Sequence, residues 1–441
     1  MPDKWAASSN EALRVSLVSS EGTSTFHPTF TYPIFGEEET IYGYTDLGIC
    51  LFLAAGSLKP ALVVSYDEKN TSTTIKVDDV QETLLEFLPD RQDFVKISQT
   101  SGEARDEQAE VKRLLAEDCK TFRPVGEKVT TYEAGSSSAS KGKGKSKTGQ
   151  GQNFEIFHCD WDTPGFKELH RRMQIFALLF IEGASYISEE EHNWEFFVVY
   201  ERTDAGEYKF VGYTSLYKFW SYPSNSRIRL SQFLVLPIYQ GQGHGSKLYD
   251  TVYAAIQARA GVSELTVEDP SEAFDHLRDR SDLTRLFSTD SSGDGFLRRA
   301  KEAKKGGALR APVDKAWSET ERLRHKIAPR QWARLVEMCM LTMLDEADVE
   351  QCRQFRLQVK ARLYRFNRDV LKQMEQHERV TKLQETYESV LDEYAALTGT
   401  DVDGIIEAGL DSAATAGVLN GGAGSGGGSG SSSSIKKARF A

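Results

Sequence analysis

Short segments with alternating apolar and polar residues occupy the middle of the chain, a pattern typical of β-strands that bury one face. Trp194 to Glu201 and Lys209 to Tyr217 alternate in this way and are rich in aromatic residues. Asp204-Ala205-Gly206 between them is a turn signal that predicts a hairpin. Further strands are predicted at Phe154 to Phe157, Arg227 to Leu236 and Ser263 to Val267.

Helical patterns lie between and after these strands. Pro164 to Ala184 is predicted to be a helix with its proline near the start, and Ser246 to Ile256 is predicted to be a second helix. From Ser271 onward the chain has a helical pattern, with charged amphipathic segments at Gln331 to Leu344 and Val349 to Tyr394. Because strands and helices alternate before Ser271, the sequence predicts an α/β arrangement there.

The first 133 residues mix both patterns. Strands are predicted at Leu13 to Val18, Ile49 to Ala54 and Ala61 to Ser65, and helices at Val80 to Leu88 and Asp106 to Leu115. We therefore expect a separate N-terminal α/β domain.

Two segments lack any apolar pattern. Residues 135–152 are rich in Gly, Ser and Lys with no apolar residue larger than Ala, and we expect a flexible insert because such a segment cannot offset its ordering entropy. The end of the chain carries a Gly/Ser run and then Lys436-Lys437-Ala438-Arg439, and we expect it to be disordered. The predicted organisation is an N-terminal domain 1–133, an insert 134–152, a core 153–283, a helical domain 284–395 and a tail 396–441.

Composition narrows the function. The 441 residues carry a formal net charge of −11, which argues against nonspecific binding to nucleic acid or anionic membranes and favours basic partners. The five cysteines include no closely spaced pair, as expected in a reducing compartment. The start of the sequence lacks the layout of a signal peptide, and the longest apolar run, Ile175 to Ile181, is too short to span a bilayer. We expect a soluble intracellular protein.

The segment with the most specific chemistry is Gln240-Gly241-Gln242-Gly243-His244-Gly245, between a predicted strand and a predicted helix. Such a turn presents backbone N–H groups at a helix N-terminus, where they bind phosphate. A nucleotide-triphosphate loop would need Gly-Lys-Ser/Thr, whereas Gly245-Ser246-Lys247 has the wrong order. A dinucleotide loop would need a third glycine at Ser246, although Glu264 lies at a tolerable distance for a ribose contact. The remaining pattern, Gln/Arg-x-x-Gly-x-Gly, is met by Gln240, Gly243 and Gly245 and resembles the coenzyme A pyrophosphate loop of the GNAT superfamily of N-acetyltransferases; a turn that only connects strand to helix is the simpler alternative.

Carboxylates follow the next strand. Glu268 and Asp269 end the segment Ser263 to Val267, at the sheet edge where α/β proteins bind ligands. A carboxylate there could accept the proton of an attacking amine, although Asp269 before Pro270 could equally cap a helix. Glu182 follows an apolar run and would be perturbed if buried, whereas an exposed glutamate is the commoner case.

Other chemistries find little support in the sequence. There is no Gly-x-Ser-x-Gly motif, and Cys159 is merely adjacent to His158. The histidines include no His-x-x-x-His pair, so no metal site is expected.

A wider match involves several separate segments. Ser231 to Gly245 and Leu265 to Asp279, together with Phe35 to Tyr44, Ala55-Gly56-Ser57 and Phe180 to Tyr186, resemble the type B histone acetyltransferase catalytic subunits, in a fungal-like form. The resemblance extends over about Leu13 to Tyr394. It implies a central GNAT-type mixed sheet flanked by helices, an α/β (α+β) fold, with an N-terminal α/β domain that contributes the substrate groove and a C-terminal helical domain.

The resemblance also implies a function. Family members transfer acetyl from acetyl-CoA to lysines in the tail of free histone H4, together with its H3 partner, and work with a WD-repeat β-propeller subunit in cytoplasm and nucleus. No metal, direct nucleic acid or membrane contact is implied. Attack would be direct, in a ternary complex, with backbone N–H groups near Leu234 stabilising the oxyanion.

Site residues follow from the same resemblance. Glu268 would be the general base, assisted by Glu182 and Asp269. The cofactor-binding residues would be Phe233, Leu234, Val235, Gln240, Gly241, Gln242, Gly243, His244, Gly245, Ser246, Ser271 and Arg280. The histone-tail groove would be lined by Glu37, Glu39, Trp194, Tyr217 and Phe219.

Two features depart from the family pattern, namely the insert and the glycine-rich tail. The insert contains Gly142-Lys143-Gly144-Lys145, which resembles the substrate tail, and a tethered copy would reach roughly millimolar effective concentration. It could act as a pseudosubstrate or as an autoacetylation site at Lys143, Lys145 and Lys147, or simply be a spacer. Two other functions stay open, a histone chaperone with secondary catalysis and an acetyltransferase for small amines, and the acidic Glu37 to Glu39 argue against the second.

Overall fold

The computed structural model describes residues 4–71, 77–94, 104–134, 152–222, 225–288 and 296–407. Two compact units are formed by Met1–Ser271 and Glu272–Ala441. The division precedes the helix α8 (Glu272–Phe287), whereas the sequence placed the end of the core at 283, inside this helix. The predicted flexible insert lies outside the described residues except at its two ends, as does the tail from 408 onward.

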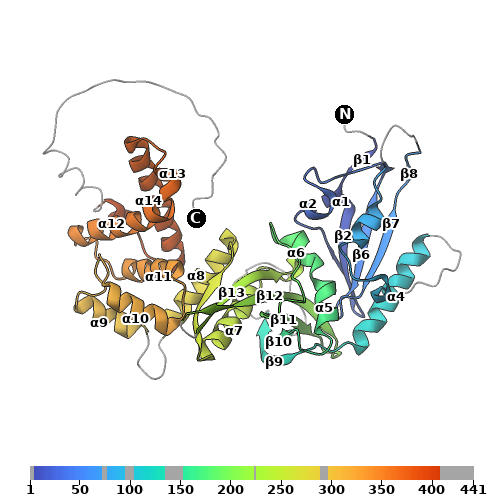
Figure 1. The fold of residues 1–441 in the computed structure, drawn as a ribbon, viewed down its shortest axis with the longest axis horizontal. Coiled ribbons are helices and arrows are strands. Elements are labelled where there is room, and N and C mark those ends of the chain that lie inside the picture. The colour runs from blue at the N-terminus through green and yellow to red at the C-terminus, as the bar shows by residue number, and fades with distance from the viewer. Residues whose placement is uncertain are drawn as a thin grey trace, which may run out of the picture. The chain divides into compact units, whose positions relative to one another are not determined.

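A six-stranded mixed sheet forms the centre of the first unit, in the order β14-β13-β12-β11-β10-β9 (Figure 1). All neighbouring strands are antiparallel except β13 and β14, which are parallel. The strands are β9 (Glu127–Ala134), β10 (Gln152–Asp160), β11 (Trp194–Arg202), β12 (Tyr208–Ser221), β13 (Asn225–Val235) and β14 (Val262–Val267). Five of them lie where the alternating pattern predicts, whereas β9 was missed because its residues are mostly polar and half or fully exposed.

A smaller sheet in the order β3-β2-β6-β7 belongs to the N-terminal part, and helix α4 (Ala104–Thr121) packs against β2 and β6. Its strands are β2 (Leu13–Ser19), β3 (Gly22–Phe26), β6 (Gly48–Ala54) and β7 (Pro60–Ser65). Strand β3 was not predicted because only Phe26 of its five residues is buried. The other elements of this part are β1 (Ala6–Ser8), α1 (Ser9–Ala12), α2 (Tyr32–Phe35), β4 (Thr40–Tyr42), β5 (Tyr44–Thr45), β8 (Glu68–Lys69), α3 (Val80–Leu85) and the 3₁₀ turn η1 (Arg91–Asp93).

Helices cover both faces of the central sheet (Figure 1). On one face, Phe196 of β11 contacts Phe166 and His170 of helix α5 (Phe166–Met173). On the other face, Phe154 of β10 contacts His244 at the start of helix α7 (His244–Ala258). These two contacts lie on opposite faces of the sheet. Phe196 pairs with Cys159 and shares its face, whereas Phe154 lies five residues before Cys159 on β10, and side chains an odd number of residues apart on a strand point to opposite faces.

The single helix predicted over Pro164 to Ala184 is wrong. The structure has α5 and a separate short helix α6 (Ile175–Phe180), and the chain is extended again at Ile181. Gly165 precedes α5 with a φ of +78°, and at the junction the backbone N–H of Ala177 bonds only three residues back, to Gln174 O at 2.9 Å. Almost every side chain of α6 is buried, so tertiary packing rather than an amphipathic pattern sets its ends.

The second unit is helical, as predicted, and the amphipathic stretch Val349 to Tyr394 is divided among three helices. That stretch forms α12 (Val349–Phe366), α13 (Arg368–Leu371) and α14 (Gln376–Thr398). Asn367 Nδ2 donates to Leu363 O at 3.2 Å, and Arg379 donates to the carbonyls of Leu371 and Met374, so side chains satisfy the helix ends. The other helices are α8, α9 (Phe296–Lys305), α10 (Lys315–His325) and α11 (Pro329–Leu341).

His170 makes the stability of the first unit sensitive to acid. Its ring is 1% exposed among the rings of Trp161, Phe166 and Phe196, and burial lowers its pKa to about 3. Below the unfolded pKa of about 6.5, the unfolded chain binds a proton that the folded protein does not. The free energy of unfolding should therefore fall on acidification, by up to about 1.4 kcal/mol per pH unit from this group.

We expect His170→Phe to remove this contribution, so that wild type loses about 2 kcal/mol more than the variant between pH 7 and pH 5. Urea unfolding at the two pH values measures the difference. Replacement of the exposed His192 by Gln is the matched control and should leave the pH dependence unchanged. Parallel curves for wild type and His170→Phe would show that this ring does not titrate on unfolding.

Candidate active site

The glycine-rich turn leads directly into helix α7. Gly241 and Gly243 have φ values of +73° and +90°, in the left-handed region that favours glycine. Gly243 is the N-cap, and the first bond of the helix runs from Lys247 N to Gly243 O at 3.1 Å. The N–H groups of the first turn have no partner inside a helix, and residues 240–243 are exposed. This end of α7 is therefore suited to bind phosphate.

Side chains of the same turn bond to the chain that precedes it or are buried. Gln240 Nε2 donates to Val235 O at 2.8 Å, and Gln242 Nε2 donates to Ile238 O at 3.0 Å in the 3₁₀ turn η2 (Pro237–Tyr239). The imidazole of His244 is 1% exposed. These three residues thus offer their backbone to a ligand, whereas their side chains shape the turn.

Strand β13 extends beyond its neighbour β14. The pairing ends at Leu230 with Val267, and Glu268 N then donates to Leu230 O at 2.9 Å. No other described strand pairs with β13 on that side, so the two strands separate from here on. Leu236 N donates to Val211 O of β12, so the backbone N–H of Leu236 faces β12. Because backbone N–H and C=O groups alternate in direction along an antiparallel strand, those of Phe233 and Val235 face the other way, toward the side that β14 leaves open. Leu234 turns its backbone to β12 and buries its side chain.

A β-bulge lies just before this opening. Ser215 of β12 pairs with Gln232, but the next residue, Leu216, pairs with Leu230. Ser231 of β13 is therefore the extra, unpaired residue of the bulge. Gln232 is buried, accepts a hydrogen bond from the Tyr213 hydroxyl at 2.9 Å and donates to Ser185 O at 3.0 Å. The amide of Gln232 thus ties the bulge to the segment after α6.

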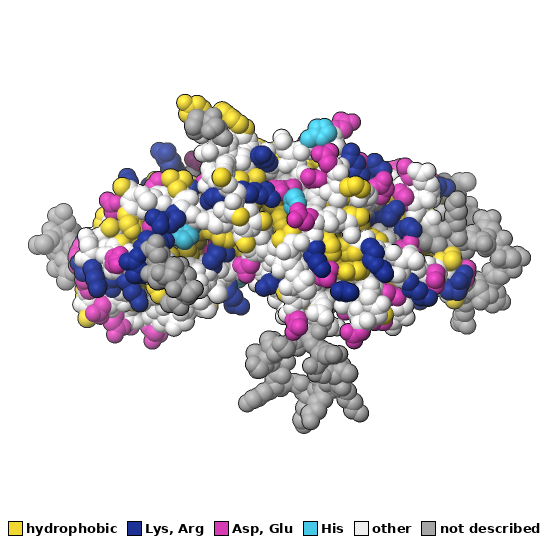
Figure 2. Space-filling view, turned by 90° about the horizontal axis from the view of Figure 1, so that it is seen from below, with side chains coloured by type: hydrophobic (Ala, Val, Ile, Leu, Met, Phe, Trp, Pro, Cys, Tyr) yellow, Lys and Arg dark blue, Asp and Glu magenta, His cyan; other side chains and the backbone are white. Residues whose placement is uncertain are grey.

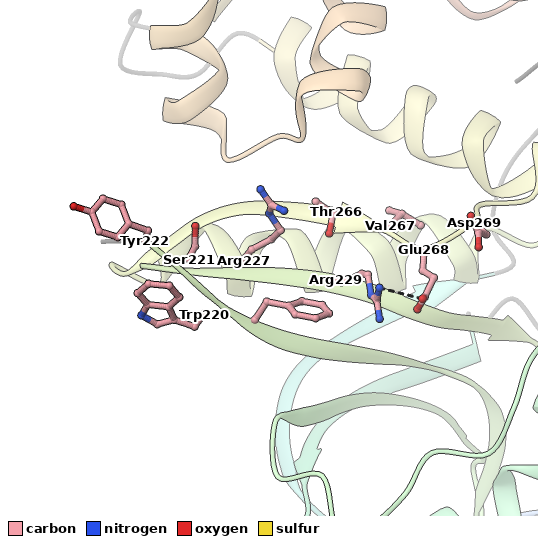
Figure 3. A pocket seen from close by; sticks show the side chains of 10 residues that line it. Trp220, Ser221, Tyr222, Arg227, Arg229, Thr266, Val267, Glu268 and Asp269 are labelled. Atoms are coloured by element: carbon pink, nitrogen blue, oxygen red, sulfur yellow. Dashed lines mark ion pairs between the residues drawn. The ribbon is translucent and has the colours of Figure 1, made fainter. Parts of the chain in front are cut away.

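Glu268 faces a pocket of about 740 Å³ at the end of β14. Its carboxylate Oε1 lies 3.1 Å from Nη1 of Arg229, and both side chains are partly exposed, at 39% and 35% (Figure 3). Asp269 follows with a φ of +34° and lines the same pocket. The lining residues are Phe219, Trp220, Ser221, Tyr222, Arg227, Arg229, Thr266, Val267, Glu268 and Asp269.

Aromatic rings form a row beside Glu268. Cross-strand pairing aligns Trp194, Tyr217, Arg229 and Thr266 on one face of the sheet. The rings of Trp194 and Tyr217 lie 4.8 Å apart, and those of Tyr217 and Phe219 lie 4.6 Å apart. The Arg229 guanidinium lies 4.7 Å from the Phe219 ring. The structure therefore brings Trp194, Tyr217 and Phe219 together with Glu268.

The two acidic residues predicted for the groove differ in their surroundings. Glu39 Oε1 accepts hydrogen bonds from Thr31 N at 2.6 Å and Tyr32 N at 3.0 Å at the start of α2, and its Oε2 accepts from Asn10 Nδ2 of α1 at 2.6 Å. Glu37 is exposed. Glu39 thus has a structural task that the sequence did not indicate.

Of the predicted site residues, Phe219, Glu268 and Asp269 line the pocket, whereas Glu182, Ser271 and Arg280 do not. Glu182 is exposed and follows α6 in a turn at Gly183, whose N–H donates to the Tyr32 hydroxyl at 2.9 Å. The predicted helical position of Glu182 is therefore wrong. Ser271 ends the first unit, and Arg280 lies exposed on α8 of the second unit.

Arg229 was missed by the sequence reasoning. Its position two residues from Arg227 in a predicted strand places both arginines on one face. This alternation was a usable signal, but the partner Glu268 becomes visible only when β13 and β14 pair.

The described residues also show whether the chain meets the requirements of a metal site, a membrane span or a charged surface. No group of three or more His, Cys, Asp or Glu residues in these segments is placed to hold a metal ion, and none of their helices combines the length and apolarity needed to cross a membrane. On the face drawn in Figure 2, acidic and basic side chains are interspersed.

Three family models match this sequence. Residues 5–182 match the family described as "Histone acetyl transferase HAT1 N-terminus", residues 155–277 match "Acetyltransferase (GNAT) family", and residues 279–345 match "Fungal HAT1, C-terminal".

Curated relatives match over nearly the whole chain. The histone acetyltransferase type B catalytic subunit of Mycosarcoma maydis is 50% identical over 93% of this chain and 91% of its own length. That of Cryptococcus neoformans var. neoformans is 41% identical over 90% of this chain and 98% of its own. A solved aminoglycoside acetyltransferase from a soil metagenomic sample is 21% identical, with a TM-score of 0.23, over 31% of this chain and 91% of that one. The chain therefore belongs to the family of histone acetyltransferase type B catalytic subunits, enzymes with a GNAT acetyltransferase core.

Proposed function

We propose that this enzyme transfers the acetyl group of acetyl-CoA to lysine side chains in the N-terminal tail of free, newly made histone H4. The observation that carries the proposal is the position of Glu268. Its carboxylate faces an open pocket next to a row of aromatic rings, on the strand that separates from β13. In this proposal the carboxylate accepts the proton of the amine, the aromatic rings contact the peptide substrate, and the open strand edge binds the acetyl-CoA arm.

The cofactor fits the other side of the opening. The positive-φ glycines and the first turn of α7 would hold the pyrophosphate through Gly241, Gly243, Gly245 and Ser246. The backbone of Phe233 and the N–H of Val235 would hold the pantetheine arm, because these groups face the open edge, whereas Val235 O already accepts a hydrogen bond from Gln240. When bound, acetyl-CoA supplies an acetyl thioester whose thiol is the leaving group.

Glu268 would act as the general base. A lysine side chain has a pKa of about 10.4, so only about one molecule in a few thousand is neutral at pH 7. Glu268 would accept the proton, directly or through a water molecule, as the amine attacks. Arg229 would hold the carboxylate in place, and the N–H of Phe233 or Val235 would stabilise the oxyanion.

Substrate choice follows from the aromatic row. Flat rings at Trp194, Tyr217 and Phe219 suit the aliphatic stem of lysine and the neighbouring glycines of a histone tail. The exposed Glu37 and the net charge of −11 would speed the encounter with a basic peptide.

Acetyl transfer to a synthetic H4 tail peptide tests the proposal. We expect acetyl-CoA-dependent modification of lysine side chains, located by mass spectrometry, and no reaction when all lysines are replaced by arginine. Spermidine at the same concentration serves as the small-amine control. Modification of spermidine but not of the peptide would favour a small-amine acetyltransferase, and binding of the peptide without any acetylation would favour a histone-binding subunit.

A further inference from the structure

A partly buried hydrogen bond joins the first residue of α7 to the edge strand of the central sheet. The Tyr132 hydroxyl of β9 and Nδ1 of His244 lie 2.9 Å apart. His244 directly follows Gly243, so its imidazole belongs to the turn whose N–H groups are suited to bind phosphate. Strand β9 lies at the far edge of the sheet from β13 and β14 and contributes no residue to the pocket at Glu268.

Three aromatic rings enclose the imidazole. Its centroid lies 4.3 Å from Phe154, 5.9 Å from Tyr132 and 5.9 Å from Tyr239. The side chain is 1% exposed, and its Nε2 has no hydrogen-bond partner among the described residues. The bond to Tyr132 is therefore the polar contact that fixes the rotation of the ring in an otherwise apolar site.

Both groups are neutral near pH 7. Burial raises the pKa of Tyr132 above its usual value and lowers the pKa of His244. The Lys247 ammonium lies 5.8 Å from the centroid of the Tyr132 ring. Removal of the Tyr132 hydroxyl leaves the buried Nδ1 of His244 without this partner, which is unfavourable because the buried atom cannot bond to water instead.

The backbone of the turn depends on this anchor. Residues 240–243 are exposed and two of them are glycines with positive φ, so the turn has few contacts of its own to hold the N–H groups in one direction. His244 is the point where the exposed turn meets the buried body of the protein. Phosphate binding requires several N–H groups to converge within a few tenths of an ångström.

We propose that Tyr132 is a positioning residue for the cofactor, which acts through His244 to hold the first turn of α7 in its phosphate-binding geometry. The inference rests on the proposed binding of acetyl-CoA at this turn. It assigns to the edge strand β9 a role in cofactor affinity, separate from the chemistry at Glu268.

The test compares Tyr132→Phe with wild type. We expect a rise of roughly three- to tenfold in KM for acetyl-CoA and in the Kd of coenzyme A, as for one lost neutral hydrogen bond. The values of kcat and of KM for the H4 peptide should stay unchanged. Tyr208→Phe is the matched control, because it removes a hydroxyl that bonds to Glu155 at 3.2 Å on the same sheet without contact to α7.

A double-variant comparison separates positioning from general loss of structure. If Tyr132 acts through the imidazole, adding Tyr132→Phe to His244→Phe should raise KM for acetyl-CoA no further. Equal effects on both KM values, additive effects in the double variant, or an unchanged KM for acetyl-CoA in Tyr132→Phe would each overturn the inference.

The Gly243→Val variant distinguishes failure of the inference from failure of the proposed cofactor site. Valine is strained at a φ of +90° and should abolish coenzyme A binding if the turn holds the pyrophosphate. If Gly243→Val binds coenzyme A as wild type does, the cofactor site itself is wrong. If Gly243→Val loses binding while Tyr132→Phe keeps it, the site stands and the inference fails.

Discussion

Replacement of Glu268 by Gln is expected to lower kcat for H4-peptide acetylation by roughly a hundredfold or more, the usual contribution of a positioned general base. The amide keeps the shape and the possible contact to Arg229 but cannot accept a proton. Because the effect falls on proton transfer, KM for acetyl-CoA should change little. Steady-state kinetics with both substrates varied gives the two constants.

The pH dependence of the variant provides a second readout. Without a base, reaction depends on lysine that is already neutral, and this fraction rises tenfold per pH unit up to a pKa of about 10.4. We therefore expect the rate of Glu268→Gln to rise steeply and to approach that of wild type at high pH. A variant that is inactive at every pH, although folded, would point to a role beyond proton acceptance.

Matched variants identify the base among three carboxylates. Asp269→Asn changes the next residue in the same pocket, and Glu182→Gln changes the exposed glutamate after α6. We expect both to keep at least a tenth of wild-type kcat. Full activity of Glu268→Gln together with a large loss in Glu182→Gln would move the base to Glu182 and remove the main support for the proposed site.

Replacement of Gly212 by Ala is expected to destabilise the first unit by about 2–3 kcal/mol, the usual cost of overpacking a buried site. A Cβ atom at Gly212 would lie 2.2 Å from Leu234 O and 2.9 Å from Val235 Cα. Both contacts are to backbone, which cannot rotate away as a flexible side chain does, so β12 and β13 must move apart. Urea unfolding of the variant gives the loss of free energy.

The same substitution should also weaken cofactor binding. Gly212 pairs with Val235, whose backbone borders the open strand edge. We expect the Kd of coenzyme A to rise in the fraction of protein that stays folded. Gly261→Ala is the control, because a Cβ there meets no atom within 4 Å and the stability should change by less than about 0.5 kcal/mol. Wild-type stability in Gly212→Ala would mean that β12 and β13 adjust without cost.

Local patterns were enough to predict the strands of the core and the glycine-rich turn before α7. Five of the six central strands have alternating or aromatic residues, and the glycines of the turn need positive φ values that few other residues adopt. Both signals lie within a few neighbouring residues, so they can be read without knowledge of the rest of the fold.

Helix ends were harder to predict. One helix was predicted where the structure has α5 and α6, and the division of Val349 to Tyr394 into α12, α13 and α14 was not predicted. The breaks at Gln174 and Asn367 depend on hydrogen bonds rather than on Gly or Pro. Helical propensity at such positions is weak, and side-chain capping or packing decides where the helix stops.

The candidate carboxylates could be named from the sequence but not ranked. Glu39 and Glu37 look alike in the chain, yet Glu39 caps α2 and Glu37 faces solvent. Glu268 and Glu182 likewise both follow apolar runs, yet Glu268 lines a pocket beside Arg229 and Glu182 lies in an exposed turn.

The sequence by itself therefore determined the family, the α/β core and the position of the turn that is suited to phosphate, because these depend on residue types at fixed spacing. Only the tertiary structure decided which carboxylate faces the pocket, which backbone groups of β13 are turned to the open edge, and that Tyr132 supports His244 across 112 residues. These features depend on strand register, and a shift of one residue would turn every side chain to the opposite face.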